Sequence, residues 1–231
     1  MKYTHLFFDL DHTLWDFEAN SEAVLQRLWE EYKLADRGIH DFSAFATRYR
    51  VHNDVLWAKF RTGTIRRDEL RWKRHWLALL DFAVADSQLA YEMSGAYLEM
   101  LPTQTSLIAG AAELLEHCKE RGYALHLITN GFELTQWQKL HSAGIARYFG
   151  EMITSERCDA MKPRKEIFEY ALRCTSAEAE HSLMIGDALE VDVLGAQAAG
   201  MDAVYYNPLR LPHTTRPTYE VSDLSALLEI L

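Results

Sequence analysis

Two aspartates stand at the end of the first apolar run of the chain. The run, residues 6–8, leads directly into Asp9 and Asp11, which are separated by a single leucine. A short apolar run of this kind is typical of a buried parallel strand. Carboxylates at the end of such a strand lie in one mouth of the sheet, where an aspartate is able to act as a nucleophile or to bind a cation.

A second pair of acidic residues follows a later apolar run. Residues 183–185 lead into Gly186 and Asp187, and Asp192 falls near the first turn of the helix expected next. Ligands of open parallel sheets bind beyond the carboxyl ends of the strands, so both pairs of aspartates are expected to converge there. Four carboxylates in one mouth repel each other, and Mg²⁺ with its oxygen ligands removes that conflict. Taken singly, such aspartates often cap turns; taken together, they predict a magnesium site.

Two further residues are expected to hold an anion at the same edge of the sheet. Thr129 ends another apolar run, and its hydroxyl group, with the N–H groups of Asn130 and Gly131, would bind phosphoryl oxygens. The alternative role for this threonine is a helix cap. Lys162 precedes a proline, which holds its predecessor extended, and its ammonium group would neutralise both Asp9 and an incoming phosphate.

The elements that must position these residues follow two different patterns. In residues 1–16 and 103–231, apolar strands alternate with helices that end at glycine, which indicates a doubly wound parallel sheet with helices on both faces. The last clear strand is expected at residues 203–206. Residues 17–102 instead show helical periodicity with almost no proline, which predicts four helices packed as a bundle. We therefore expect an α/β core interrupted by a helical cap.

Composition narrows the other possibilities. The chain has 231 residues, of which 48% are hydrophobic and 25% charged, as in an ordinary globular protein with a sizeable core. The formal charge of −10 argues against binding to nucleic acid or to an anionic membrane. The three cysteines are widely spaced, and no signal-like or membrane-spanning stretch is visible, so we expect a cytoplasmic protein. These features leave the oligomeric state open.

The polar segments resemble a known set of motifs. In order and spacing, the four motifs of the haloacid-dehalogenase superfamily are matched by Asp9-x-Asp11-x-Thr13, Thr129, Lys162 and Gly186-Asp187-x4-Asp192. The resemblance is spread over the whole core. It implies a Rossmann-like sheet with a helical cap inserted just after the first motif.

The same resemblance implies a role for each residue. Asp9 would be the nucleophile that forms an aspartyl-phosphate, and Asp11 the general acid and then the base. Dehalogenases lack this second acid, because a halide leaves without a proton, so we expect a phosphatase. Phosphate would be held by Thr129 and Lys162, with Thr13, Asn130 and Gly131 as further substrate-binding positions. The ligands of Mg²⁺ would be Asp9, the carbonyl oxygen of Asp11, and Asp187, with Asp192 in support.

A stretch of the expected cap bears on the substrate. Residues 56–65 and 128–132 resemble a branch of bacterial pyrimidine nucleoside 5′-monophosphatases, which implies that the phosphate monoester is a nucleotide. A nucleotidase needs aromatic groups that stack on a base, and Trp57 is one candidate, unless it packs in the cap core. A related branch with a similar cap acts on sialic-acid 9-phosphate. A sugar-phosphate phosphatase and a phosphomutase therefore remain alternatives.

Two non-enzymatic functions share some of these residues. A receiver-like domain that accepts a phosphoryl group also combines strand-end aspartates with a threonine and a lysine, but it is much shorter and has no helical bundle after the first motif. A binding-only protein of the same fold would have no need of Asp9, Asp11 and Asp187 together. Hydrolysis of a phosphate monoester is therefore the expected activity.

Overall fold

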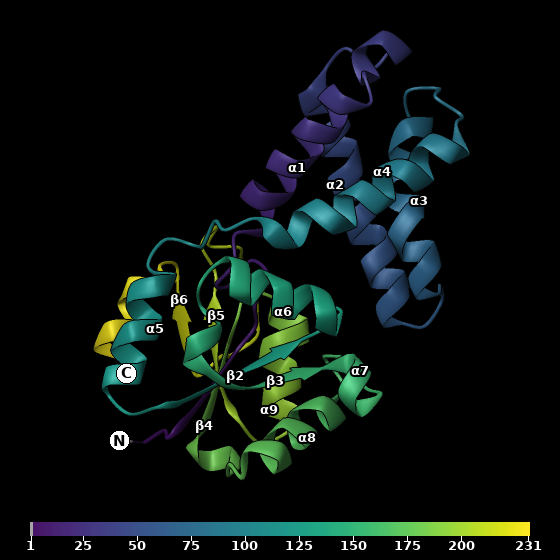
Figure 1. Ribbon diagram of the computed structural model, residues 1–231. Coiled ribbons are helices and arrows are strands. Elements are labelled where there is room, and N and C mark those ends of the chain that lie inside the picture. The colour runs from purple at the N-terminus through teal and green to yellow at the C-terminus, as the bar shows by residue number, and fades with distance from the viewer. Residues whose placement is uncertain (1) are drawn as a thin grey trace. The chain divides into compact units, whose positions relative to one another are not determined.

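The computed structural model describes residues 2–231, which form two compact units (Figure 1). The core unit comprises Met1–Phe17 and Thr105–Leu231, and the cap unit comprises Glu18–Gln104. These bounds differ from the predicted ones by one residue at the first boundary and by two at the second. Within the described residues, no helix combines the length and the apolar character needed to cross a membrane.

The core unit is built on a six-stranded parallel sheet in the order β3-β2-β1-β4-β5-β6. Its strands are β1 (His5–Phe8), β2 (Ala124–Thr129), β3 (Phe149–Thr154), β4 (Ser182–Gly186), β5 (Asp202–Tyr206) and β6 (Tyr219–Val221). The first strand lies between β2 and β4, so the residues that follow it are next to the ends of two other strands. The predicted Rossmann-like doubly wound sheet is confirmed.

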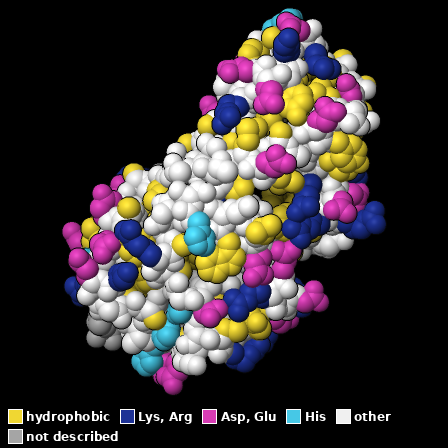
Figure 2. All heavy atoms as spheres, viewed as in Figure 1, with side chains coloured by type: hydrophobic (Ala, Val, Ile, Leu, Met, Phe, Trp, Pro, Cys, Tyr) yellow, Lys and Arg dark blue, Asp and Glu magenta, His cyan; other side chains and the backbone are white. Residues whose placement is uncertain are grey.

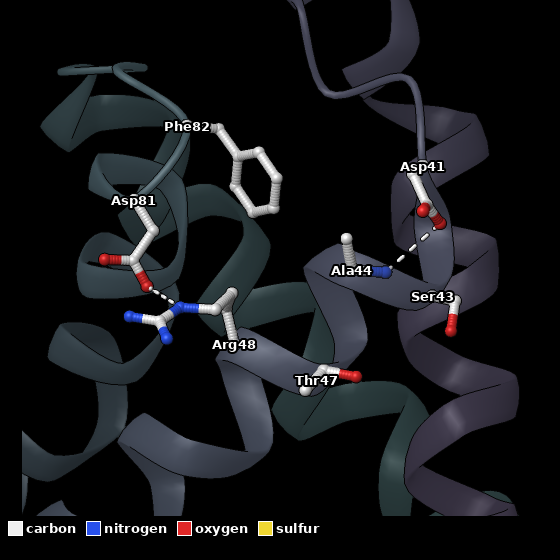
Figure 3. Close-up of a pocket in the computed structure, with 7 residues that line it drawn as sticks. All are labelled: Asp41, Ser43, Ala44, Thr47, Arg48, Asp81 and Phe82. Atoms are coloured by element: carbon white, nitrogen blue, oxygen red, sulfur yellow. Dashed lines mark hydrogen bonds and ion pairs between the residues drawn. The ribbon is translucent and has the colours of Figure 1, made fainter.

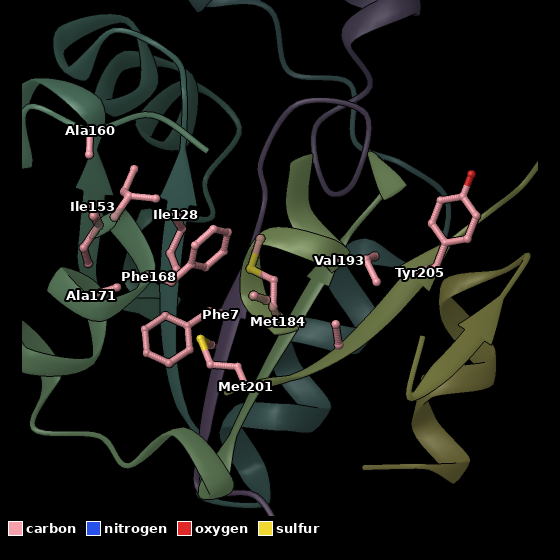
Figure 4. Packing of buried hydrophobic residues seen from close by; sticks show 13 residues of the cluster. Phe7, Ile128, Ile153, Ala160, Phe168, Ala171, Met184, Val193, Met201 and Tyr205 are labelled. Carbon is pink, nitrogen blue, oxygen red and sulfur yellow. The ribbon is translucent and has the colours of Figure 1, made fainter. Parts of the chain in front are cut away.

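Helices of the core lie between the successive strands from β1 to β5, whereas a loop joins β5 to β6. They are α5 (Ala111–Glu120), α6 (Glu133–Ser142), α7 (Ser155–Cys158), α8 (Lys165–Thr175) and α9 (Leu194–Ala198). Figure 4 shows the apolar cluster on one side of the sheet, where Phe7 and Met184 of the strands pack with Phe168 of α8. Leu6 and Phe8, which alternate with Phe7 along β1, are also fully buried. Both faces of the central strand are therefore covered, as a parallel sheet requires.

The cap unit contains the four predicted helices. They are α1 (Phe17–Glu31), α2 (Phe42–Arg61), α3 (Arg67–Leu80) and α4 (Ser87–Met100). Asp41 caps α2 by accepting the N–H of Ala44, and Asp86 caps α4 by accepting the N–H of Leu89. On the face that Figure 2 shows, acidic, basic and apolar side chains are interspersed over the surface.

Two elements differ from the expected pattern. The sequence pattern missed β6, because a three-residue strand is too short to show alternation. The helix expected after β4 starts as a π-helical turn, Leu189–Val193, before α9. Within this wider turn the side chain of Asp192 bends back and accepts the N–H of Ala188 at 3.1 Å. Such turns are frequent at functional sites.

A histidine pair, in which His126 is buried and His5 half-buried, makes the stability of the core depend on pH. Nε2 of His126 on β2 lies 3.1 Å from Nδ1 of His5 on β1. Burial, helped by His5 and opposed by Glu151 on β3, lowers the pKa of His126 to about 4. The unfolded chain binds more protons than the folded one between the ordinary pKa of histidine and this value, so stability falls as the pH falls through that window.

We expect the free energy of unfolding to drop by about 1–2 kcal/mol between pH 6.5 and pH 4 because of His126, after allowance for solvent screening. Urea titrations at several pH values measure it, with His126→Leu as the comparison, because leucine has no proton to bind. The variant should lose less stability than the wild type over this range. If the free energy of unfolding fell equally with pH in both proteins, the prediction would be contradicted.

Candidate active site

The loop after β1 places two carboxylates at the centre of the sheet edge. The N–H of Asp9 still donates to the carbonyl of Ile185 on β4 at 2.9 Å, so Asp9 is anchored between the strand ends. Beyond it the chain turns tightly: the N–H groups of Leu14 and Trp15 both donate to the carbonyl of Leu10. The loop therefore brings Asp9 and the residues just after it to one mouth of the sheet.

Lys162 is the centre of a buried charge cluster. Its Nζ donates to Oδ1 of Asp9 at 2.5 Å, to Oδ1 of Asp192 at 2.6 Å and to the carbonyl of Ile128 at 2.7 Å, which uses all three of its protons. The residue is only 2% exposed. Burial by itself would lower the pKa of this ammonium group, but Asp192 and Asp9 outweigh it and raise the pKa above the ordinary value. Lys162 is therefore a fixed cation beside Asp9.

The aspartates of this cluster fit a divalent cation. Oxygens of Asp9, Asp187 and Asp192 lie within 4.8 Å of one another. Burial raises the pKa of Asp9 and Asp187, and the neighbouring carboxylates raise both further. Three carboxylates share one ammonium group, so excess negative charge remains at the site when all three are ionised. A hard cation with oxygen ligands would balance this charge, and Asp9 and Asp187 could be among its ligands.

Thr13 supports Asp187. Its hydroxyl donates to Oδ1 of Asp187 at 3.1 Å and accepts the N–H of the same residue at 3.1 Å. Thr13 is fully buried, so the bond fixes the orientation of the carboxylate. In the structure this threonine thus positions a carboxylate of the site, and contact with substrate stays a prediction for it.

Gly186 leaves the space that Asp192 occupies. A Cβ at this position would lie closer than 3.0 Å to side-chain atoms of Asp192, a distance that real Cβ atoms essentially never show. We expect Gly186→Ala to lower the free energy of unfolding by about 1–3 kcal/mol, since the carboxylate must move away from Lys162. Urea unfolding measures this loss.

The matched control for this prediction is Gly95→Ala, in the middle of α4, where a Cβ would meet nothing within 4 Å. Alanine is the better helix former, so this variant should be more stable by about 0.5–1 kcal/mol. Equal effects of the two substitutions would show that the space at Gly186 is not needed.

Thr129 has a hydroxyl proton that is available to a ligand. Its oxygen accepts the N–H of Gly131 at 3.0 Å and Nε2 of Gln136 at 2.7 Å, which fills both lone pairs. None of the hydrogen bonds among the described residues uses the proton of this hydroxyl group. It is therefore able to donate to a phosphoryl oxygen.

Asn130 and Gly131 make contacts within the protein that the sequence did not predict. The side chain of Asn130 holds the backbone of Lys162, accepting its N–H at 2.8 Å and donating to its carbonyl at 3.0 Å. The N–H of Gly131 is directed to Thr129 rather than to the mouth of the site. Contact of this N–H with a phosphoryl oxygen stays a prediction, and it would require the N–H to turn from Thr129 or to be shared with the ligand.

Two residues that contact Asp11 were not predicted. Gln136 and Lys139 of α6 donate to Oδ2 and Oδ1 of Asp11, at 2.9 and 2.5 Å. Burial raises the pKa of Asp11, but Lys139 and Gln136 outweigh it and hold this pKa below the ordinary value. The signal was present in the sequence: two polar residues three positions apart share the buried face of a helix with Leu140.

The comparison with protein families agrees with this geometry. The family model described as haloacid dehalogenase-like hydrolase matches residues 3–200 of the chain. The chain belongs to this family. The predicted superfamily is thereby confirmed.

Relatives within the haloacid dehalogenase-like hydrolases resemble the chain over its full length. Pyrimidine 5′-nucleotidase PynA of Streptococcus pneumoniae is 34% identical, covering 100% of this chain and 96% of the relative. Pyrimidine 5′-nucleotidase YjjG of Escherichia coli is 31% identical, covering 100% and 99%. The crystal structure of the HAD-hydrolase YfnB of Bacillus subtilis, bound to magnesium, has a TM-score of 0.88 and 31% identity, covering 100% of this chain and 99% of that one.

The cap unit of this haloacid dehalogenase-like hydrolase holds the remaining predicted residue, Trp57. Its half-buried ring lies on α2, with the ring of Phe60 5.7 Å away in an edge arrangement. Contact with a base stays a prediction for Trp57. The cap also has a pocket of about 550 Å³ beside the start of α2 and the end of α3 (Figure 3). Arg48 and Asp81, which line it, form an ion pair, and the pocket contains none of the predicted catalytic residues.

Proposed function

We propose that the chain is a Mg²⁺-dependent phosphate-monoester hydrolase that works through an aspartyl-phosphate on Asp9. One observation carries the proposal: Asp9 lies between the strand ends with a fully bonded lysine, Lys162, 2.5 Å from its carboxylate. The ammonium group offsets the repulsion between this carboxylate and an incoming phosphate. Asp187 for the cation and Thr129 for a phosphoryl oxygen come from neighbouring strands of the same sheet.

In the first step an oxygen of Asp9 attacks phosphorus, and the bond from phosphorus to the ester oxygen breaks. For this step Asp11 must be protonated, although Lys139 and Gln136 favour its carboxylate form; it then gives its proton to the departing oxygen, so that an alcohol leaves rather than an alkoxide. Lys162 stays beside Asp9 and stabilises the negative charge that develops on the transferred group. The Thr129 hydroxyl donates to one phosphoryl oxygen.

In the second step Asp11, now a carboxylate, takes a proton from a water molecule. The oxygen of that water forms a bond to phosphorus, and the bond to the Asp9 oxygen breaks. Phosphate leaves and Asp9 is regenerated as a carboxylate. The lowered pKa of Asp11 favours the base form that this step needs.

The residues that would hold Mg²⁺ are Asp9, Asp187 and the backbone carbonyl oxygen of Asp11. When bound, the cation supplies positive charge that stabilises the phosphoryl oxygens during transfer. Asp192 keeps Lys162 in place from the other side. The fold would hold the oxygens of Asp9, Asp187 and the Asp11 carbonyl at fixed positions for the cation.

We propose pyrimidine nucleoside 5′-monophosphates as the substrates. The support is the full-length similarity to PynA and YjjG, which are both named pyrimidine 5′-nucleotidases. The cap segment around Trp57 supports the same class of substrate.

We also propose a cytoplasmic location, which accords with the free cysteines at 118, 158 and 174.

A panel of phosphate monoesters tests the proposal. Pyrimidine and purine nucleoside 5′-monophosphates and several sugar phosphates are assayed for phosphate release, with Mg²⁺ and with EDTA. We expect release that needs Mg²⁺ and is fastest for the pyrimidine nucleotides. A preference for sugar phosphates would contradict the nucleotidase, a bisphosphorylated product would indicate a mutase, and release from none of the esters would contradict the phosphatase.

A further inference from the structure

Helix α6 presents two buried polar side chains to Asp11. Gln136 is fully buried and Lys139 is 3% exposed, although both are residue types that usually lie at the surface. Each oxygen of the Asp11 carboxylate has its own donor, Lys139 on Oδ1 and Gln136 on Oδ2. A carboxylate held at both oxygens has a fixed orientation.

The amide of Gln136 also reaches the phosphate-binding threonine. Its Nε2 lies 2.9 Å from Asp11 and 2.7 Å from Thr129, so its two N–H groups join these side chains. The chain makes room for this bridge, because a Cβ on Gly131 would lie closer than 3.0 Å to Gln136. A single amide thus sets the distance between the acid–base residue and the hydroxyl group that would hold phosphate.

Lys139 is held as firmly as Gln136. Its ammonium group lies 4.3 Å from the centre of the Trp15 ring and 5.6 Å from that of Phe17. Such contacts stabilise a desolvated cation. Because two aromatic rings and Asp11 all contact the ammonium group, Lys139 has little freedom to follow a displaced carboxylate.

We propose that Gln136 and Lys139 are positioning residues that hold Asp11 for proton transfer, above all for the step in which water attacks the aspartyl-phosphate. The inference rests on the proposed function and adds two residues to it. Each oxygen of Asp11 has a further lone pair beyond the one that its donor uses, so the held carboxylate still accepts a proton from water.

The test separates the two chemical steps with p-nitrophenyl phosphate. Nitrophenolate leaves without being protonated, so phosphorylation of Asp9 does not need Asp11 as an acid, whereas hydrolysis of the aspartyl-phosphate still needs it as a base. In Lys139→Met and Gln136→Leu we expect a rapid burst of about one nitrophenolate per enzyme, followed by turnover about 10²-fold slower than in the wild type. Phosphorylated enzyme should accumulate in acid-quenched samples.

Matched variants complete the experiment. Lys139→Arg, which restores a donor, should recover part of the turnover, and Gly131→Ala should reproduce the burst by displacing Gln136. The controls Lys165→Met and Gln88→Leu remove exposed side chains that bond only within their own helices, and they should behave as the wild type. Lys165 and Gln88 are of the same residue types as Lys139 and Gln136.

Two results would overturn the inference: wild-type kinetics in both variants, or slower turnover with no burst and no phosphorylated enzyme in proteins that melt at the wild-type temperature. The second result would mean that both steps had slowed together, as a general loss of structure at the site produces. A wild-type enzyme that releases no nitrophenolate would contradict the proposed function instead.

Discussion

Replacing Asp9 with asparagine is expected to lower kcat for phosphate release by about 10⁴-fold or more. The amide is a poor nucleophile and makes no aspartyl-phosphate. Steady-state assays on the best ester of the panel measure the loss. Acid-quenched samples should contain no phosphorylated protein.

The same substitution should not weaken the fold. Burial and the neighbours Asp192 and Asp187 disfavour the charge on Asp9 despite Lys162, as the raised pKa of Asp9 shows. A neutral amide of the same shape removes that charge, so the melting temperature without Mg²⁺ should equal or exceed that of the wild type. Loss of activity then has a chemical cause rather than a structural one.

Asp202→Asn is the matched control for Asp9→Asn. Asp202 starts β5, opposite to the end of the sheet that carries the site, and it binds Lys2 and Tyr3. Its loss should leave kcat unchanged. Substantial phosphate release by Asp9→Asn would rule out Asp9 as the nucleophile.

The site residues that follow strands could be predicted because their positions depend on short-range features. Asp9 and Asp187 each follow an apolar run, and parallel strands must bring such ends to one edge. Lys162 was recognisable through a motif, but its three bonds depend on Ile128 and Asp192, which lie far from it in sequence. Residue type and spacing do not reveal such a set of partners.

The contacts that the sequence did not reveal depend on tertiary packing. The spacing of Gln136 and Lys139 places them on the helix face of Leu140, but the sequence does not show that Asp11 is their partner. The sequence did not indicate that the missing side chain of Gly131 admits Gln136, and binding of phosphate by its N–H stays a prediction. The helical cap, in contrast, was predictable throughout, because four long helices repeat their apolar positions many times.

Lys162→Met is expected to have the largest effect on stability, lowering the free energy of unfolding by about 3–5 kcal/mol. The lysine is buried between Asp9 and Asp192, and methionine fills similar space without charge. Two buried carboxylates are then left without their cation, which costs more than the lost contacts alone. Urea unfolding in EDTA measures the change, and Lys165→Met, which removes an exposed lysine three residues later, should change stability by less than about 0.5 kcal/mol.

A second substitution separates charge balance from chemistry. Adding Asp192→Asn to Lys162→Met removes one of the two unpaired carboxylates, so we expect about half of the lost stability to return. Phosphate release should stay at least about 10³-fold below the wild type in both variants, because no ammonium group remains beside Asp9 to offset the charge of the phosphate. A double variant no more stable than Lys162→Met would mean that the lysine stabilises the core through packing. Recovery of phosphate release would mean that its charge has no part in the reaction.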